Sequence, residues 1–236
     1  MKKYVSVFML FVRSSIYGVL GLLIGMGIGQ GILFAMDGLH AANLAWALHS
    51  KPSFSGIVIT LGLLCGMLNG PFCDRGGKIN NTLQRLSISE KQIFWMQAAA
   101  NGLMITLYFL FQGLLFVLFS FWYDPQVDLL TILVVSYDNP LFHTFFPLGN
   151  WMVILTNLIV IVGLAICCAA YPMRQRHNKQ SITTFLMILV SFFYLFLQKE
   201  GDPLEVGYCV LIILAAIYCI TVALCGTMSL EVDDYE

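Results

Sequence analysis

The chain has 236 residues, of which 59% are apolar and only 11% are charged. Water-soluble domains carry about 25% charged residues, so this composition argues against an ordinary soluble domain. The 13 acidic and 12 basic residues give a net charge of −1, which argues against a generally basic nucleic-acid-binding protein. The seven cysteines are an odd number and lie in or beside apolar stretches, so a secreted disulfide scaffold is not expected either.

Apolar stretches long enough to cross a bilayer follow one another along the chain. The six stretches lie near residues 14–36, 54–72, 93–122, 150–172, 181–198 and 205–228. Such runs exceed the length of a barrel strand and lack its polar–apolar alternation, and in lipid every backbone polar group needs an internal partner. The expected fold class is therefore all-α, with six transmembrane helices in one membrane domain covering residues 1–236.

The basic residues predict the orientation of these helices. Ten of the twelve Lys and Arg residues lie before the first span or in the second–third and fourth–fifth connections, and only Lys51 and Lys199 lie on the other side. The positive-inside rule then places both termini in the cytoplasm. Within residues 1–13, Lys2 and Arg13 share one helical stripe, which predicts a helix lying in the membrane interface. A straight extension of the first span would give a similar pattern.

The connection between the third and fourth spans, residues 123–149, is expected on the external side. Its apolar run, Leu129 to Val135, is too short to cross a bilayer. It either dips into the outer leaflet or forms one short element of an external loop.

Small residues recur every fourth position on three spans, which places them on one face of each helix. They are Gly21, Gly25 and Gly29 on the first span, Gly62, Gly66 and Gly70 on the second, and Ala215, Cys219, Ala223 and Thr227 on the last. Such faces allow close packing of another helix. For the glycines, the alternative is a smooth face on which neighbouring helices slide during transport.

The interiors of the spans contain polar side chains that are few and uncharged. The notable ones are Gln30, Asn69, Asn101, Gln112, Asn157 and Ser191. They either form hydrogen bonds between helices or line a substrate route. Proton- and sodium-coupled transporters normally keep an ionisable group within the bilayer, so the sequence disfavours an ion-coupled carrier.

Sequence motifs for catalysis and nucleotide binding are not found. A phosphate-binding loop ending at Lys78 would need glycine at Phe72 and Ser or Thr at Ile79. The four histidines form no H-E-x-x-H zinc motif, and no G-x-S-x-G nucleophile motif occurs. The sequence therefore predicts no catalytic, metal or cofactor site in this chain, and we do not expect an enzyme.

The loop after the second span carries the most informative motif. It reads DRGGKINNTLQRLSISEKQIFWMQ from residue 74. A short helix is expected first, with Leu83 and Leu86 on its apolar side. Either Ser87 or Ser89 then caps a second helix, which begins near Glu90 and continues into the third span. The short helix is either a handle for a partner protein or part of a solvated connecting loop.

This loop resembles the corresponding region of bacterial ABC-2 type transporter permeases, where a pattern close to T-L-x-x-L-P-I-S-x-x-x-I follows the second span. The matching residues are Thr82, Leu83, Leu86, Ile88, Ser89 and Ile93. Ser87 stands where the family usually has proline, and Gln97 where a basic residue often closes the segment. The six spans, the cytoplasmic termini and the chain length extend the resemblance over nearly the whole chain.

The resemblance implies that the energy source is a separate subunit. In that family the short helix is a coupling helix that docks on an ABC ATPase dimer, which binds ATP and Mg. The coupling residues would be Thr82, Leu83, Arg85, Leu86, Ile88, Ser89 and Glu90. A second permease chain, identical or related, would complete the transporter in the lipid of a bacterial cytoplasmic membrane.

Two functions follow as hypotheses. The first is the permease subunit of an ATP-driven ABC exporter for a hydrophobic or amphipathic substrate, such as an antimicrobial peptide or a lipid-like molecule. Its candidate substrate route comprises Gln30, Asn69, Asn101, Gln112 and Asn157. The alternative is a membrane immunity or assembly protein that binds a peptide or partner and transports nothing. No nucleic-acid partner is expected.

Overall fold

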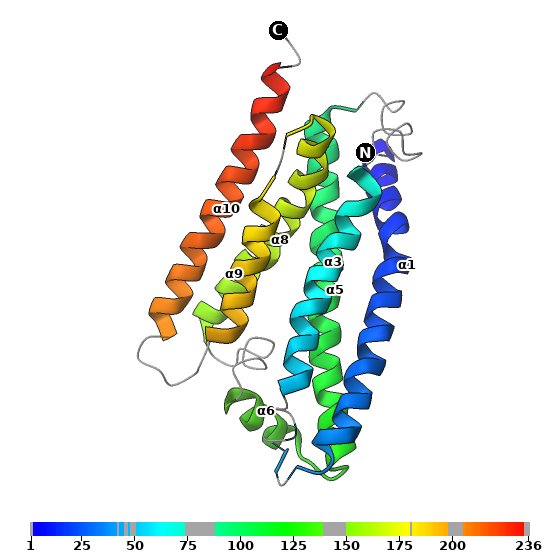
Figure 1. Cartoon of the computed structure of the whole chain (residues 1–236), viewed down its shortest axis with the longest axis vertical. Coiled ribbons are helices and arrows are strands. Elements are labelled where there is room, and N and C mark those ends of the chain that lie inside the picture. Colours follow the sequence, from blue (N-terminus) through cyan, green and yellow to red (C-terminus); the bar gives the residue numbers. More distant parts are fainter. Residues whose placement is uncertain are drawn as a thin grey trace.

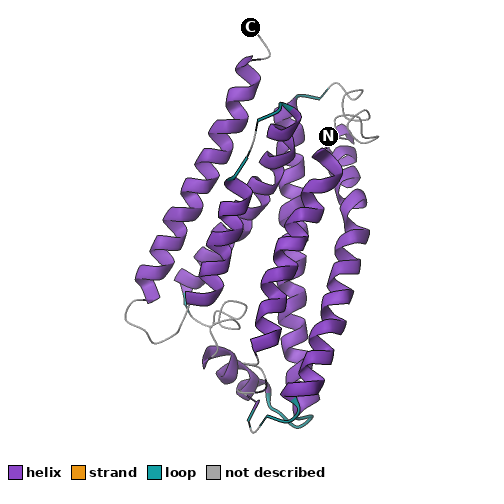
Figure 2. Ribbon diagram, viewed as in Figure 1, coloured by secondary structure: helices purple, strands orange, loops and turns teal. Residues whose placement is uncertain are grey.

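The computed structural model of the chain describes residues 2–41, 43–44, 47, 51–73, 88–138, 150–179, 181–197 and 205–233. Within these ranges the regular structure is entirely helical, as Figures 1 and 2 show. The α-helices are α1 (Lys2–Leu33), α3 (Lys51–Cys73), α5 (Glu90–Tyr123), α6 (Leu129–Asp138), α8 (Trp151–Arg176), α9 (Thr183–Leu197) and α10 (Glu205–Asp233). A short π-helix, η1 (Phe34–Gly38), extends α1. The predicted all-α fold class is confirmed for the described residues.

Four helices have the length and composition needed to cross a membrane: α1, α5, α8 and α10. The two remaining helices of the bundle contain shorter apolar segments, Ile59–Asn69 in α3 and Thr183–Leu195 in α9. Large apolar side chains cover the outside of the bundle, among them Ile24, Leu110 and Leu211. Soluble monomers rarely expose apolar surface on this scale, so this is the surface of a membrane protein.

The helices form an elongated bundle with α8 at its centre. Helix α8 packs against α3, α5, α9 and α10, while α1 packs against α3 and α5 at the opposite edge from α10. The start of α1 and the end of α10 lie at one end of the bundle, here named the termini end (Figure 1). Helix α6, which contains the apolar run Leu129 to Val135, lies at the other end, here named the α6 end.

Small side chains explain the central position of α8. Its residues from Gly163 to Ala170 are all buried, and most of them are glycine, alanine or cysteine. Because these side chains are short, α3, α5, α9 and α10 can approach the α8 backbone closely. A hydrogen bond of 2.8 Å from Thr184 Oγ1 to the carbonyl oxygen of Cys167 fixes α9 against α8.

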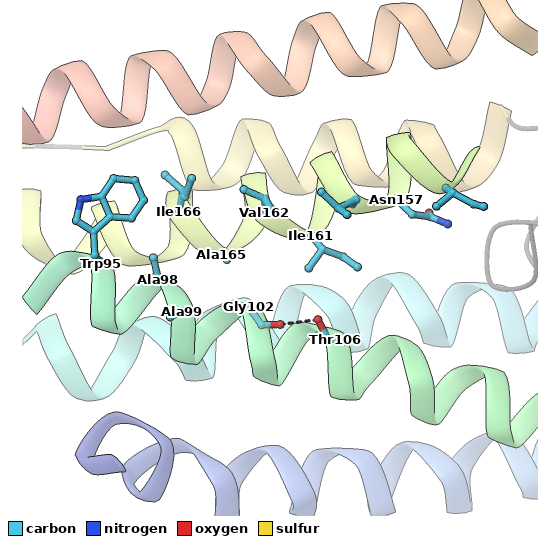
Figure 3. Close-up of a pocket in the computed structure, with 12 residues that line it drawn as sticks. Trp95, Ala98, Ala99, Gly102, Thr106, Asn157, Ile161, Val162, Ala165 and Ile166 are labelled. Carbon is cyan, nitrogen blue, oxygen red and sulfur yellow. Dashed lines mark hydrogen bonds between the residues drawn. The ribbon is translucent and has the colours of Figure 1, made fainter. Parts of the chain in front are cut away.

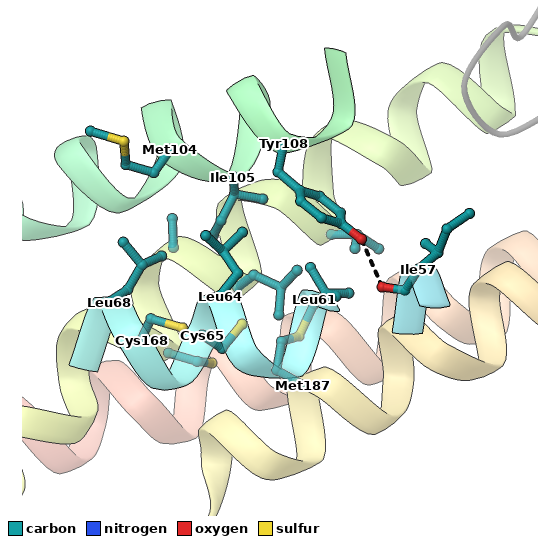
Figure 4. Packing of buried hydrophobic residues seen from close by; sticks show 14 of the residues in the cluster. Ile57, Leu61, Leu64, Cys65, Leu68, Met104, Ile105, Tyr108, Cys168 and Met187 are labelled. Atoms are coloured by element: carbon teal, nitrogen blue, oxygen red, sulfur yellow. Dashed lines mark hydrogen bonds between the residues drawn. The ribbon is translucent and has the colours of Figure 1, made fainter. Parts of the chain in front are cut away.

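The apolar core lies between α3, α5, α8 and α9. Figure 4 shows Leu64, Leu68, Met104 and Ile105 interdigitating at its centre, and all four side chains are almost completely buried. Together with Leu61 they form a continuous apolar layer midway along the bundle, here named the middle layer.

The N-terminal segment differs from the expected arrangement. Residues 2–33 form one continuous helix, so an interfacial helix ending near Arg13 and followed by a turn is not present. No glycine or proline interrupts residues 2–17, and Ser14 Oγ bonds the carbonyl oxygen of Phe11 at 2.8 Å, a contact that a continuous helix accommodates. The alternative, a straight extension of the first span, is the one observed.

The glycine stripes of α1 and α3 meet no close neighbour among the described residues. A Cβ atom added at Gly21, Gly25, Gly29, Gly62 or Gly66 would have no heavy atom within 4 Å, and the side-chain position of Gly70 lies outside the described residues. Helix α1 instead faces the bundle through Val19, Leu23 and Met26. No other described helix packs on these five glycines, so close packing of another helix on these faces stays a prediction. On α10, Cys219, Ala223 and Thr227 of the expected stripe are buried, whereas Ala215 is only half-buried.

Candidate functional site

The expected coupling segment is described only at its end. Thr82, Leu83, Arg85 and Leu86 lie outside the described residues. Ile88 and Ser89 precede α5, which begins at Glu90 with Ser89 as its N-cap residue in an extended conformation. The predicted start of the second helix is therefore confirmed, although the Ser89 side chain makes no capping hydrogen bond.

A polar contact joins the start of α5 to the end of α8 at the termini end. His177 Nε2 lies 3.3 Å from Glu90 Oε2. The turn that ends α8 positions the histidine, because Asn178 adopts a left-handed conformation with φ of 56° and the backbone N–H groups of His177 and Lys179 both bond the carbonyl oxygen of Arg174. The first turn of α5 is thus linked to the central helix of the bundle.

Two of the predicted route residues meet in the half of the bundle nearer the α6 end. Gln30 of α1 donates from Nε2 to Gln112 Oε1 of α5 at 3.5 Å. The Nε2 group of Gln112 in turn lies 2.6 Å from the sulfur atom of Met26. Both glutamines are buried, so the interpretation that they form a hydrogen bond between helices is confirmed.

A second pair of polar residues, not singled out from the sequence, lies close by. Tyr108 of α5 donates a hydrogen bond of 2.7 Å to the carbonyl oxygen of Ile57 in α3, as Figure 4 shows. Its hydroxyl oxygen is also 2.9 Å from Thr60 Oγ1. We name Gln30, Thr60, Tyr108 and Gln112 the α6-side polar layer, in which protein hydrogen bonds connect α1, α3 and α5.

Nearer the termini end, α5 carries a second pair of buried amides. The side chains of Gln97 and Asn101 are only 1% and 2% exposed. Gln97 Nε2 and Asn101 Nδ2 have no hydrogen-bond partner in the part of the chain that the structure describes. Asn101 was expected either to form a hydrogen bond between helices or to line a substrate route, whereas Gln97 entered the sequence argument only as a departure from the permease motif. The spacing of four residues, which places both on one helix face, could have indicated it.

The remaining polar residues predicted from the sequence are Asn157, Ser191 and Asn69. Asn157 of α8 accepts a hydrogen bond of 2.8 Å from the Tyr194 hydroxyl of α9, which joins these two helices. Ser191 bonds its own helix at the carbonyl oxygen of Met187. Asn69 is buried on α3. The structure therefore brings Gln30 and Gln112 together but does not join all five predicted residues into one site.

An open groove lies between α5 and α8 on the apolar surface, with a volume of about 630 Å³. Trp95 lies at one end of the groove and Asn157 near the other, with Ala98, Gly102 and Ala165 between them (Figure 3). The only hydrogen bond drawn there, from Thr106 Oγ1 to the carbonyl oxygen of Gly102, lies within α5. The groove is thus lined mainly by small and apolar side chains.

Over the described ranges, no group of three or more His, Cys, Asp or Glu side chains is placed to hold a metal ion. The described cysteines, Cys65, Cys167, Cys168, Cys209, Cys219 and Cys225, are all free thiols. Comparison with family models, curated proteins and solved structures finds no match to this chain.

Proposed function

We propose that this chain is the permease subunit of an ATP-driven exporter, with the ATPase on a separate subunit that binds the segment between α3 and α5. The proposal includes six membrane crossings with both termini in the cytoplasm. It also includes a hydrophobic or amphipathic cargo, because the groove and the buried layers offer apolar walls and neutral polar groups.

The observation that carries the proposal is the position of α5. This helix begins at Glu90, directly after the segment that resembles a coupling helix, and it packs against both α1 and α8. The contact between Glu90 and His177 also links its first turn to the end of α8. A displacement of the segment would therefore move two neighbouring helices with α5, which is what force transmission from an ATPase requires.

The spans also lack groups that could bind a coupling ion through a charge. The buried polar side chains of the described residues are Ser, Thr, Asn and Gln. Placing an ionisable group in the bilayer centre costs about 2.5–3.5 kcal/mol on insertion scales, and coupled carriers accept this cost for ion binding. An external energy source agrees with this composition.

Affinity purification from native membranes in a mild detergent tests the proposal. We expect an ATPase with a phosphate-binding loop to copurify with the chain and to be lost when Leu83→Asp and Leu86→Asp are combined, because two carboxylates would oppose docking in an apolar groove. Leu129→Asp with Leu130→Asp is the matched control, since both leucines are exposed on α6 at the opposite end. Recovery of no ATPase with the parent chain would favour the immunity or assembly alternative.

A further inference from the structure

The groove between α5 and α8 extends over about one leaflet of a bilayer. On α8 its lining runs from Ile154 to Ile166, or about 18 Å along the helix axis. The hydrocarbon core of a bilayer is about 30 Å thick, so one leaflet contributes about half of this. A transmembrane helix of a second copy would need a surface that extends over both leaflets. The length of the groove therefore fits a lipid acyl chain better than a helix.

The polar side chains that line the groove are compatible with an apolar occupant. Thr106 Oγ1 donates to the carbonyl oxygen of Gly102 at 2.8 Å, and Asn157 Oδ1 accepts from the Tyr194 hydroxyl at 2.8 Å. Trp95 lies at the end of the groove nearer the start of α5 (Figure 3) and is 43% exposed. Tryptophan side chains are enriched where acyl chains meet the polar headgroups, so headgroups are expected beyond Trp95.

Two basic residues lie beyond Trp95 on the helix faces that line the groove. A Cβ atom at Gly102 would lie 3.5 Å from Ala165 Cβ, so these two residues lie at the same level of α5 and α8. Lys91 precedes Gly102 by eleven residues, and Arg176 follows Ala165 by eleven. Eleven residues are about three helical turns, and the two helices run in opposite directions (Figure 1). Lys91 and Arg176 therefore lie at about the same level on these two faces.

The neighbouring arginine, Arg174, is directed to another helix. A Cβ atom at Gly226 of α10 would lie 2.9 Å from Arg174 Cζ, so this guanidinium packs on α10. Its buried Nε has no hydrogen-bond partner in the described ranges. Arg176 is two residues further on, which places it on the opposite side of α8, and its Nε donates to the carbonyl oxygen of Pro172 at 3.3 Å. Arg176 is therefore the arginine on the groove side.

The described residues at the start of α5 and the end of α8 carry more bases than acids. The bases are Lys91, Arg174, Arg176 and Lys179, and the acid is Glu90. The Glu90 carboxylate lies 3.3 Å from His177. An anionic group placed between Lys91 and Arg176 would therefore meet a net positive charge, whereas its attached chain would lie against the apolar lining of the groove.

We infer that the groove between α5 and α8 binds an anionic phospholipid of the membrane, with one acyl chain along the groove and the phosphate group at Lys91 and Arg176. Lys and Arg residues near a membrane surface attract anionic headgroups, and a guanidinium matches the geometry of a phosphate. Trp95 then lies where chain and headgroup meet. The inference goes beyond the proposed function and does not rest on it, because it needs only a bundle that crosses the membrane.

Native mass spectrometry of the purified full chain in detergent tests the lipid site. Anionic phosphatidylglycerol should bind about tenfold or more tightly than phosphatidylcholine, which has no net charge. Combining Lys91→Gln with Arg176→Gln should remove this preference, and each single substitution should remove part of it. Lys2→Gln with Arg13→Gln is the matched control, since it removes two positive charges from α1 at the same end of the bundle and should keep the preference.

Ala99→Leu tests the position of the acyl chain. Ala99 is exposed in the groove, so the longer side chain would fill the groove without entering the core and should weaken binding of both lipids. The melting temperature of each variant without added lipid, measured in the same detergent, should equal that of the parent chain.

Three results would overturn the inference. The first is equal binding of the two lipids by the parent chain, or a loss of preference in the Lys91 and Arg176 variants no greater than in the control. The second is full competition by soluble glycerol phosphate, which has no acyl chain. The third is a second copy of the chain that Ala99→Leu displaces while lipid binding stays unchanged, because the groove would then hold that copy.

Discussion

At the residue scale, Tyr108 shows how a polar group is accommodated in an apolar bundle. Its ring is packed in the core, while its hydroxyl donates to the carbonyl oxygen of Ile57 and contacts Thr60. A buried tyrosine hydroxyl usually finds such a partner. The residue thus adds one directed contact between α3 and α5 to packing that is otherwise non-directional.

Replacing Tyr108 by phenylalanine should lower the free energy of unfolding by about 0.5–1.5 kcal/mol, because one hydrogen bond is lost while the ring is kept. Denaturant titration in detergent measures the change. Tyr218→Phe is the matched control, since Tyr218 is 65% exposed on α10 and should be neutral. Equal losses in the two variants would show that the Tyr108 hydroxyl contributes nothing specific.

Sequence reasoning identified Gln30, Asn101 and Gln112 because amides are conspicuous in apolar spans. It did not pair them or select Gln97, because pairing depends on the offset between helices that are far apart in sequence. Tyr108 was overlooked for a related reason. Tyrosine counts as apolar in composition, and only the helix arrangement shows whether its hydroxyl is buried.

At the element scale, the two kinds of glycine in the bundle have different surroundings. Gly25 of α1 has open space where a Cβ atom would lie, whereas a Cβ atom at Gly163 of α8 would lie 2.7 Å from Met187 Cε. An alanine at 163 would therefore require the end of the Met187 side chain, which is completely buried on α9, to shift. At Gly25 no described residue would have to move.

Gly25→Ala should raise the free energy of unfolding by about 0.5–1 kcal/mol, because alanine is the better helix former. Gly163→Ala should lower it, since overpacking costs about 1–3 kcal/mol and exceeds that gain. The same denaturant titration compares both variants with the parent chain. Destabilisation by Gly25→Ala would reveal a close neighbour on that face of α1.

Helix positions were predicted well, whereas the faces turned to the core were predicted only in part. The ends of α3, α5, α8, α9 and α10 agree with the apolar stretches to within about five residues, because charged and turn-forming residues limit each stretch. The helix faces that point to the core could not be predicted from the sequence in the same way. Lipid tails are as apolar as leucine, so hydrophobic periodicity does not distinguish the core from the lipid-facing surface, and the glycine stripes alone did not show which neighbour their faces of α1 and α3 meet.

At the scale of the whole molecule, the bundle separates two ends with different composition. The start of α1, the start of α5 and the end of α8 meet at the termini end, where most basic residues lie in the sequence. The opposite end carries α6 and the acidic residues Asp124 and Asp128. The positive-inside rule predicts the orientation of the bundle from this difference in charge between its two ends.

Labelling of introduced cysteines checks the orientation. With Asp128→Cys, an impermeant thiol reagent should react from outside the cell, and with His177→Cys only after access to the cytoplasm is given, because these positions lie at opposite ends of the bundle. Mass spectrometry of the labelled peptides gives the result for each position. The reverse pattern would place the termini outside and remove the proposed coupling segment from the reach of a cytoplasmic ATPase.

The central claim is that this chain depends on a partner for energy. The most direct measurement of this claim uses the purified chain alone in sealed vesicles. A sodium or proton gradient is imposed, and uptake of a fluorescent amphipathic dye is followed over time. The account predicts no accumulation above protein-free vesicles, because the chain offers no ionisable site within its spans for a coupling ion. Dye accumulation that collapses when the gradient is dissipated would contradict it.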